Sequence, residues 1–159
     1  MINEDQSNFE YRTLKTGSRQ IRLVELRQPT DSTDVDCGLE YTSLNENPTY
    51  EALSYTWGDP SDTAEIKING LPFPVTRNLA ICLQEWRRKN SGIAKLWVDA
   101  VCINQKDDEE KSLQVLQMKQ IYENASKIVV WLGEESDDSS YAMDSMAQVD
   151  KLSVMKPER

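Results

Sequence analysis

The sequence of 159 residues contains no histidine. This absence removes the commonest general base and metal ligand of enzymes, and it excludes Ser-His-Asp and Cys-His catalysis within the chain. The three cysteines, Cys37, Cys82 and Cys102, are an odd number and show no CxxC spacing. They therefore indicate neither a disulfide framework nor a zinc site. Any catalysis must use carboxylates, hydroxyls, a thiol or a bound cofactor.

Positive charge is also scarce, because 18 Lys and Arg face 27 Asp and Glu, which gives a net charge of -9. Such a chain is repelled by the phosphates of nucleic acids and anionic membranes, so we expect neither as a partner. Long apolar runs and a signal-peptide pattern are missing, so we expect no membrane-spanning segment and a cytoplasmic location. The length and the apolar fraction of 38% suit a single globular domain.

The best-defined unit of the sequence covers residues 95–133. Two apolar runs, at 95–98 and 127–132, have the composition of strands, and a helix pattern of about four turns lies between them. Asp107 and Glu110 form the start of a capping box for this helix. Strand, helix and strand in this order predict a βαβ unit in a parallel sheet. The apolar residues expected near one face of the helix are Leu113, Leu116, Met118, Ile121, Tyr122 and Ala125.

Several shorter patterns predict further strands. Residues 21–26 and 39–44 are strand candidates that can pair antiparallel, and residues 52–57 form a third. A hairpin is predicted at 65–76, because the Asn69-Gly70 pair favours a type I′ turn. Two prolines in its second arm place that arm at an edge of the sheet.

Two more helical patterns complete the prediction. The first begins at Thr76 or Asn78, which can cap it, and ends at Asn90-Ser91-Gly92. The second is an amphipathic pattern near the end of the chain, with Ala142, Met146 and Val149 on one side.

The chain is expected to divide simply. Residues 1–18 are polar and turn-rich and are predicted to form a flexible arm, whereas residues 19–159 form one α/β domain. Charged residues soon follow the last pattern, and we expect this domain to be the N-terminal part of a longer chain.

Three sequence blocks together resemble a known family. YEALSYTWGDP at 50–60, LWVDAVCINQ at 96–105 with EKSLQVLQM at 110–118, and IYENASKIVVWLG at 121–133 are similar to the signature blocks of the fungal heterokaryon-incompatibility (HET) domain. This resemblance covers roughly residues 20–150. It implies an effector of regulated cell death after non-self recognition, with self-association and an upstream sensor domain or protein as partners.

A more distant resemblance concerns chemistry. Residues 50–59 look like the first-strand box of Toll/interleukin-1 receptor (TIR) domains, which implies a flavodoxin-like, mainly parallel sheet flanked by helices, here with added β-hairpins. Some TIR domains hydrolyse NAD at the nicotinamide glycosidic bond, so NAD is a possible substrate, and no cofactor is required. TIR domains use a glutamate on the helix after the strand that corresponds to 128–132. The matching stretch, 139–149, contains no glutamate, and Asp144 is its nearest carboxylate.

Glu110, Asp99 and Asp144 are the candidate catalytic carboxylates. Glu110 can bind a ribose diol or stabilise an oxocarbenium-like centre, as carboxylates do in glycosidic cleavage, or it can serve only as a helix cap. Asp99 follows a strand, where a carboxylate either contacts a ligand or caps loop amides.

The candidate nucleotide-binding residues follow the ends of two strands or precede a helix. Trp57 can stack on a ring or belong to the core, and Arg77 can bind a phosphate or form a surface ion pair. Asn104 and Gln105 can recognise a base edge or hold their own loop. The remaining candidates, all in the first signature block, are Ser54, Tyr55, Gly58 and Asp59.

Two other features are expected to be structural. Cys102 has no histidine partner, which favours a buried, inert thiol. The acidic loop at 134–138 lacks the spacing of an EF-hand, which favours a solvated loop over a cation site.

Two mechanisms are therefore open. In the first, Asp99, Asn104 and Glu110 line one pocket with Trp57, and the domain hydrolyses NAD. In the second, these residues cap one another and are buried, and the domain is a signalling adaptor.

Overall fold

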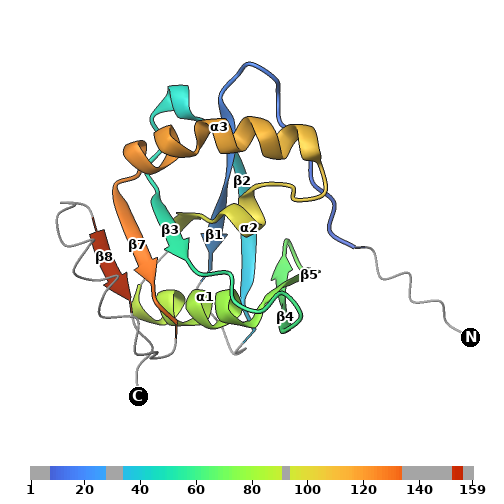
Figure 1. The fold of residues 1–159 in the computed structure, drawn as a ribbon, viewed down its shortest axis with the longest axis vertical. Helices are drawn as coiled ribbons and strands as arrows, with labels where there is room; N and C mark the ends of the chain where they lie inside the picture. Colours follow the sequence, from blue (N-terminus) through green and yellow to red (C-terminus); the bar gives the residue numbers. More distant parts are fainter. Residues whose placement is uncertain (1–7, 28–33, 91–93, 134–151, 156–159) are drawn as a thin grey trace, which may run out of the picture.

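The computed structural model describes residues 8–27, 34–90, 94–133 and 152–155 (Figure 1). Its strands are β1 (Gln20–Leu26), β2 (Asp36–Ser43), β3 (Glu51–Tyr55), β4 (Thr63–Ile68), β5 (Leu71–Thr76), β6 (Ala94–Trp97), β7 (Lys127–Trp131) and β8 (Leu152–Met155). Its helices are α1 (Arg77–Lys89), α2 (Asp99–Cys102), α3 (Asp108–Asn124) and the 3-10 turn η1 (Leu44–Glu46).

All eight strands belong to one sheet, in the order β5-β4-β2-β1-β6-β3-β7-β8. β1 runs antiparallel to both β2 and β6, and β4 runs antiparallel to β5. The remaining neighbours are parallel: β2 with β4, β3 with β6, β3 with β7, and β7 with β8. The α/β class is confirmed, but the sheet is mixed, so the prediction of a mainly parallel sheet is wrong. The reason is that β1 joins the centre of the sheet, where it connects two groups of strands.

The predicted βαβ unit is present. β6 and β7 are joined through α2 and α3, and both pair in parallel with β3, which lies between them. The short helix α2 occupies part of the segment that was expected to be a polar loop. Asp99 is its first residue.

The predicted hairpin is confirmed, with β4 and β5 in register from Thr63 opposite Thr76 to Ile68 opposite Leu71. Asn69 and Gly70 have φ angles of 53° and 79°, the left-handed conformations that a type I′ turn requires. β5 is the last strand at one edge of the sheet, in agreement with its prolines.

Part of the N-terminal arm is anchored. Tyr11 donates its hydroxyl hydrogen bond to the carbonyl of Val101 at 2.6 Å, and the rings of Phe9 and Phe73 pack edge to face, 5.8 Å apart. These contacts hold Phe9 and Tyr11 against the domain, whereas residues 1–7 lie outside the described residues, so the flexible arm at 1–18 stays a prediction.

Helix α1 lies along β3. The side chain of Asn78, near its start, donates to the carbonyl of Thr56, which follows β3, at 2.6 Å. Trp86, about two turns later, donates to Glu51 at the start of β3 at 3.0 Å. Thr76 caps the helix as predicted, because its hydroxyl accepts a hydrogen bond from the amide of Leu79.

Helix α3 differs from its prediction. Only Gln114 and Ile121 of this helix are buried, whereas Leu113 and Leu116 are exposed. The expected single apolar face is wrong for these two leucines, since they lie on the outer side and Ile121 on the inner side. Figure 1 shows α3 along one end of the sheet and α1 along the other.

Little is described of the end of the chain, so most predictions for residues after 133 are untested. The acidic loop at 134–138 and the amphipathic pattern at Ala142, Met146 and Val149 lie outside the described residues. β8 was not predicted; it adds a parallel strand beside β7.

Candidate functional site

The C-terminal ends of β3, β6 and β7 meet at one edge of the sheet, because the three strands are parallel neighbours. Open α/β sheets bind ligands at such edges. Asn78 of α1 connects two of these strand ends: it donates to the carbonyl of Thr56 and accepts a hydrogen bond from Trp131 Nε1 at 2.9 Å. The start of α1 therefore joins the segment that follows β3 to the last residue of β7.

Asp99 lies at this edge directly after β6. Its Oδ1 accepts a hydrogen bond from the amide of Ala100 at 2.7 Å, and its Oδ2 accepts one from Trp57 Nε1 at 3.2 Å. Burial raises the pKa of the Asp99 carboxyl, although both hydrogen bonds oppose this shift. Trp57 is 41% exposed, so it is not the core residue that the sequence allowed as one alternative. Its ring covers a partly buried carboxylate.

Tyr55 adds a buried polar group beside Asp99. Its hydroxyl is inaccessible to solvent and has no hydrogen-bond partner among the described residues. Burial raises the pKa of Tyr55, and the nearby negative charge of Asp99 raises it further. An unpaired buried hydroxyl is uncommon and calls for a specific explanation, such as a water molecule or a ligand.

Glu110 forms a second, separate centre. Its Oε1 lies 2.6 Å from Nη2 of Arg22, and the two side chains are only 10% and 1% exposed. Its Oε2 accepts a hydrogen bond from the amide of Asn104 at 2.9 Å. Asp107 caps α3 as predicted by accepting from the amide of Glu110, but Glu110 does not return to Asp107 as a capping box would require.

Arg22 was missed by the sequence interpretation. It donates to the carbonyls of Cys102 at 3.0 Å and Arg12 at 2.8 Å, and its guanidinium lies 4.6 Å from the ring centre of Tyr11. The only sequence signal was one basic residue in an otherwise apolar strand pattern. Its ionic partner, Glu110, lies far along the chain, so local patterns could not identify the pair.

The loop between α2 and α3 holds itself together. The side chain of Gln105 donates to the carbonyl of Asp99 at 2.9 Å, and the side chain of Asn104 accepts from the amide of Lys106 at 3.2 Å. These contacts are the loop-holding role that the sequence left open for both amides.

The remaining candidates are partly paired or partly outside the structure. Arg77 forms an exposed ion pair with Asp62 at 2.8 Å. Asp59 accepts from Ser61, and these hydrogen bonds lower the pKa of Asp59. Cys102 is buried, as expected, and burial raises the pKa of its thiol to about 12. The other candidates are Ser54, which is half-buried, Gly58, which has a φ of 77°, and Asp144, which lies outside the described residues.

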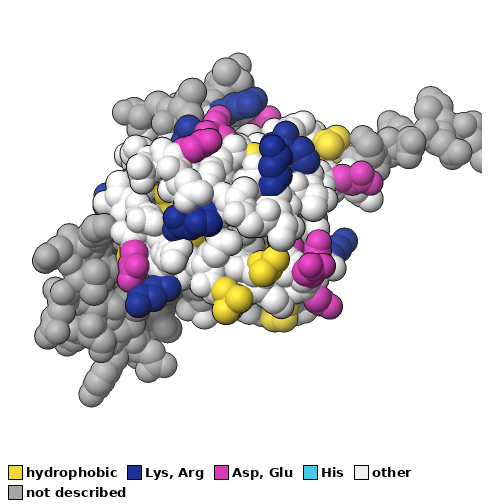
Figure 2. Space-filling view, turned by 90° about the horizontal axis from the view of Figure 1, so that it is seen from above, with side chains coloured by type: hydrophobic (Ala, Val, Ile, Leu, Met, Phe, Trp, Pro, Cys, Tyr) yellow, Lys and Arg dark blue, Asp and Glu magenta, His cyan; other side chains and the backbone are white. Residues whose placement is uncertain are grey.

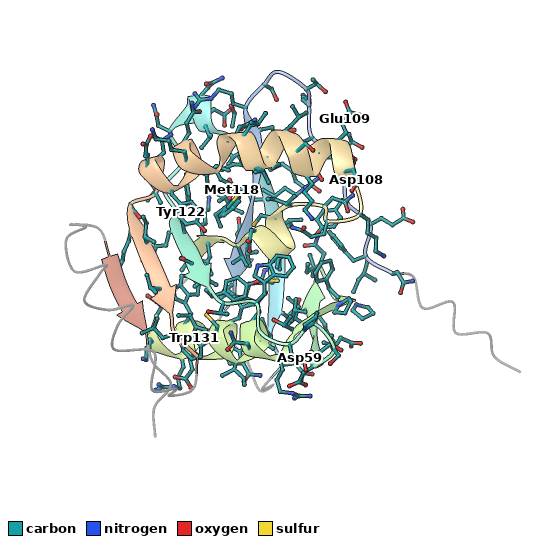
Figure 3. All side chains as sticks on the ribbon, viewed as in Figure 1. Asp59, Asp108, Glu109, Met118, Tyr122 and Trp131 are labelled. Carbon is teal, nitrogen blue, oxygen red and sulfur yellow. The ribbon has the colours of Figure 1, made fainter. Side chains whose placement is uncertain are left out.

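The contacts described above join the predicted residues into two groups. Trp57, Tyr55 and Asp99 lie at the strand ends, whereas Glu110 is tied to Arg22 at the start of α3. Figure 3 shows Asp59 well apart from Glu109, the neighbour of Glu110. An open groove of about 280 Å³ lies beside the Glu110 group, between residues 13–20 and the first half of α3, and Glu110 is one of its lining residues.

The raised pKa of Asp99 predicts a pH dependence of stability. A carboxyl whose folded pKa exceeds its unfolded value loses its proton first in the unfolded chain, so stability falls as pH rises from about 4 through the raised pKa. We expect the unfolding free energy of the wild type, relative to Asp99→Asn, to fall across this window. Urea unfolding followed by tryptophan fluorescence at several pH values measures this difference.

The matched control is Asp59→Asn, because the pKa of Asp59 is lowered and the expected trend has the opposite sign. A wild-type advantage over Asp99→Asn that grows with rising pH would show that the Asp99 carboxyl is not desolvated.

The described residues show neither a metal-binding cluster nor a membrane-spanning helix. They contain no group of three or more Cys, Asp or Glu side chains that could hold a metal ion. None of the helices in this part of the chain combines the length and the apolar character needed to cross a bilayer.

Comparisons with known proteins place this geometry in context. The family model described as "Heterokaryon incompatibility protein (HET)" matches residues 50–159. The chain is 37% identical over 155 residues to "Heterokaryon incompatibility protein 6, OR allele" of Neurospora crassa, a match that covers 89% of this chain and 23% of that protein. No solved structure matches the chain. The resemblance indicated by the three signature blocks is confirmed, whereas the likeness to TIR domains stays a prediction.

Proposed function

The chain belongs to the heterokaryon incompatibility (HET) family, and we propose that it is an effector domain of heterokaryon incompatibility that acts in the cytoplasm through self-association. The observation that supports this role is the 37% identity to a heterokaryon incompatibility protein over most of the chain. An upstream sensor domain or protein would control when copies of the domain meet.

The contacts of Glu110 favour a structural role of this residue over a catalytic one. Both of its carboxylate oxygens already have partners, Arg22 on one side and the amide of Asn104 on the other. A carboxylate held in this way stabilises the start of α3 and the loop before it, and it needs no substrate. Glu110 is therefore buried and paired, as we expect if the domain is a signalling adaptor.

The outer side of α3 favours self-association. Leu116 is 79% exposed, and Leu113 is also exposed. Exposed leucines that neighbour each other on a helix lose contact with water when a partner covers them, which stabilises the complex.

Induced expression in a filamentous fungus tests the role. We expect the wild-type chain to stop growth and to admit a membrane-impermeant dye, because self-association at high concentration would replace the upstream trigger. The control is a chain with Trp131→Ala, which we expect to fold poorly, induced to the same messenger level. Accumulation of folded wild-type chain without any loss of viability would contradict the proposed role.

A second candidate function is hydrolysis of NAD at the nicotinamide glycosidic bond. The cluster at the strand ends favours it: Asp99 has a raised pKa, Tyr55 offers an unpaired hydroxyl, and Trp57 is exposed enough to stack on a ring. Asp99 would accept a proton from water as the water attacks the anomeric carbon and nicotinamide leaves, which yields ADP-ribose.

Nicotinamide release by the purified chain at high concentration separates the two candidates. Under the self-association account we expect no release above that of a protein-free control. Release that is lost in Asp99→Asn and retained in Asp59→Asn would establish hydrolysis at the strand ends, because Asp59 is exposed and lies outside the Asp99 cluster.

A further inference from the structure

The outer face of α3 carries a heptad seam. Glu109, Leu113, Leu116 and Gln120 follow one another at spacings of four, three and four residues, which is the a/d repeat of helices that pair with helices. The two leucines at the centre are 42% and 79% exposed. Figure 2 views the molecule from the α3 side and shows hydrophobic side chains gathered on this face beside a group of acidic ones.

The inner face of the same helix is already occupied. Gln114 donates to the carbonyl of Gln20, Tyr122 donates to that of Leu53, and Ile121 is fully buried. Figure 3 shows Met118 and Tyr122 on the side that faces the sheet. At the two ends of the seam, Glu109 borders the groove beside residues 13–20 and Gln120 accepts from Arg19, but Leu116 at its centre is 79% exposed and open to a partner outside the domain.

We propose that this seam binds the same seam of a second copy of the chain, with the two α3 helices antiparallel. The inference rests on the proposed self-association and names the surface that performs it. In the register that joins the apolar residues, Leu113 of each copy packs against Leu116 of the other. The two-fold axis then crosses the seam midway between Leu113 and Leu116, and Glu109 lies opposite Gln120 of the second copy.

The charges beside the seam are complementary only in this orientation. Lys119 of one copy lies within two residues of the level of Asp108 of the other, on the same flank of the seam. Lys106 comes level with Glu123, which lies 3.8 Å from Lys119 of its own chain. A parallel pairing would place each of these residues beside its own equivalent, where like charges repel. The antiparallel arrangement therefore brings the acidic first turn of α3 near Lys119 of the other copy.

Arg19, on the other flank of the seam, also faces an acidic residue of the second copy in this arrangement. Arg19 donates to the side chain of Gln120 at 2.5 Å, so it lies beside the last turns of the seam. In the antiparallel pair, Glu109 of the second copy reaches this position. An acidic and a basic group thus meet on each flank of the interface.

The size of the seam sets the strength of pairing. α3 has 17 residues, about 25 Å of helix, and contributes two leucines per copy. Such an interface is smaller than the roughly 1,600 Å² of a standard stable complex. The dimer is therefore weak, and it forms when copies are concentrated, as a signal that recruits several copies would achieve.

Sedimentation velocity over a concentration series tests the seam. We expect the wild-type chain to dimerise and Leu116→Glu to raise the dissociation constant by at least about tenfold, because an unpaired charge would replace a buried leucine. Val115→Glu is the matched control: Val115 is also exposed, at 51%, but it lies on the flank of the seam and not in it. Its effect on the dissociation constant is expected to be much smaller than that of Leu116→Glu.

Charge reversal tests the orientation. Asp108→Lys and Lys119→Asp each place like charges opposite each other in their own dimers, so each variant alone is expected to dimerise less than the wild type. Mixing the two variants restores opposite charges at both positions, so the mixture is expected to form a heterodimer. A mixture that associates no better than either variant alone overturns the antiparallel arrangement.

The outcomes separate this inference from the proposed function. Dimerisation that persists unchanged in Leu116→Glu overturns the α3 interface and leaves self-association in place. A wild-type chain that remains monomeric at every concentration overturns both.

Discussion

Replacing Arg22 by methionine is expected to lower the free energy of unfolding by about 3–5 kcal/mol, the usual cost of removing one partner of a buried ion pair. Methionine fills much of the space of the arginine stem but leaves the carboxylate of Glu110 buried without its cation. The carbonyls of Cys102 and Arg12 also lose their donor. Because small domains are stable by about 5–15 kcal/mol, this single change removes a large part of the total.

Urea unfolding measures this loss, and two further variants test its cause. Arg77→Met removes an ion pair in which both partners are exposed and is expected to cost no more than about 1 kcal/mol. Arg22→Met combined with Glu110→Leu removes both charges and is expected to be more stable than Arg22→Met alone. Equal costs for Arg22→Met and Arg77→Met would contradict a structural role for the Arg22–Glu110 pair.

Trp131→Ala is the second large effect, with an expected loss of about 3–5 kcal/mol in unfolding free energy. Trp131 is fully buried at the end of β7, and its ring nitrogen donates to Asn78. The substitution leaves a cavity and removes the contact through which α1 is fixed to this strand end. We therefore expect the start of α1 to be held less firmly against β7 as well.

The control for Trp131→Ala is Trp57→Ala, because Trp57 is a second tryptophan at the same edge of the sheet. Trp57→Ala removes a partly exposed ring and one hydrogen bond to Asp99, and is expected to cost about 1 kcal/mol. Thermal unfolding followed by circular dichroism compares the two variants. A loss for Trp57→Ala as large as that for Trp131→Ala would show that the ring of Trp57 is a core element.

Local signals in the sequence predicted local structure well. The Asn69-Gly70 turn and the caps at Thr76 and Asp107 depend on a few neighbouring residues, and the structure has all three. The strand–helix–strand unit was equally accessible, because its two periodicities differ and the elements follow each other directly.

The direction of each strand and its position in the sheet could not be predicted from local sequence patterns. Apolar, β-branched composition is shared by parallel and antiparallel strands, so the pattern of β1 could not show that it would join β2 and β6 at the centre of the sheet. The mixed sheet follows from that one long-range placement.

In the candidate site, too, the local features could be predicted and the long-range contacts could not. The first and second signature blocks do place Trp57 and Asp99 together at the strand ends, where parallel strands were expected to bring them. The role of Glu110 depended on its ion pair with Arg22, a residue that lies far earlier in the chain. The exposure of Leu116 depended on which side of α3 meets the sheet, and its apolar residues lie on more than one side of the helix.

The central claim, that the domain acts through contacts made by copies of itself, is tested most directly by the fungal viability assay with two variants side by side. We expect Leu116→Glu to abolish cell death while it remains folded, and Asp99→Asn to retain it. Death that persists in Leu116→Glu and disappears in a folded Asp99→Asn chain would contradict the account and assign the effect to chemistry at the strand ends.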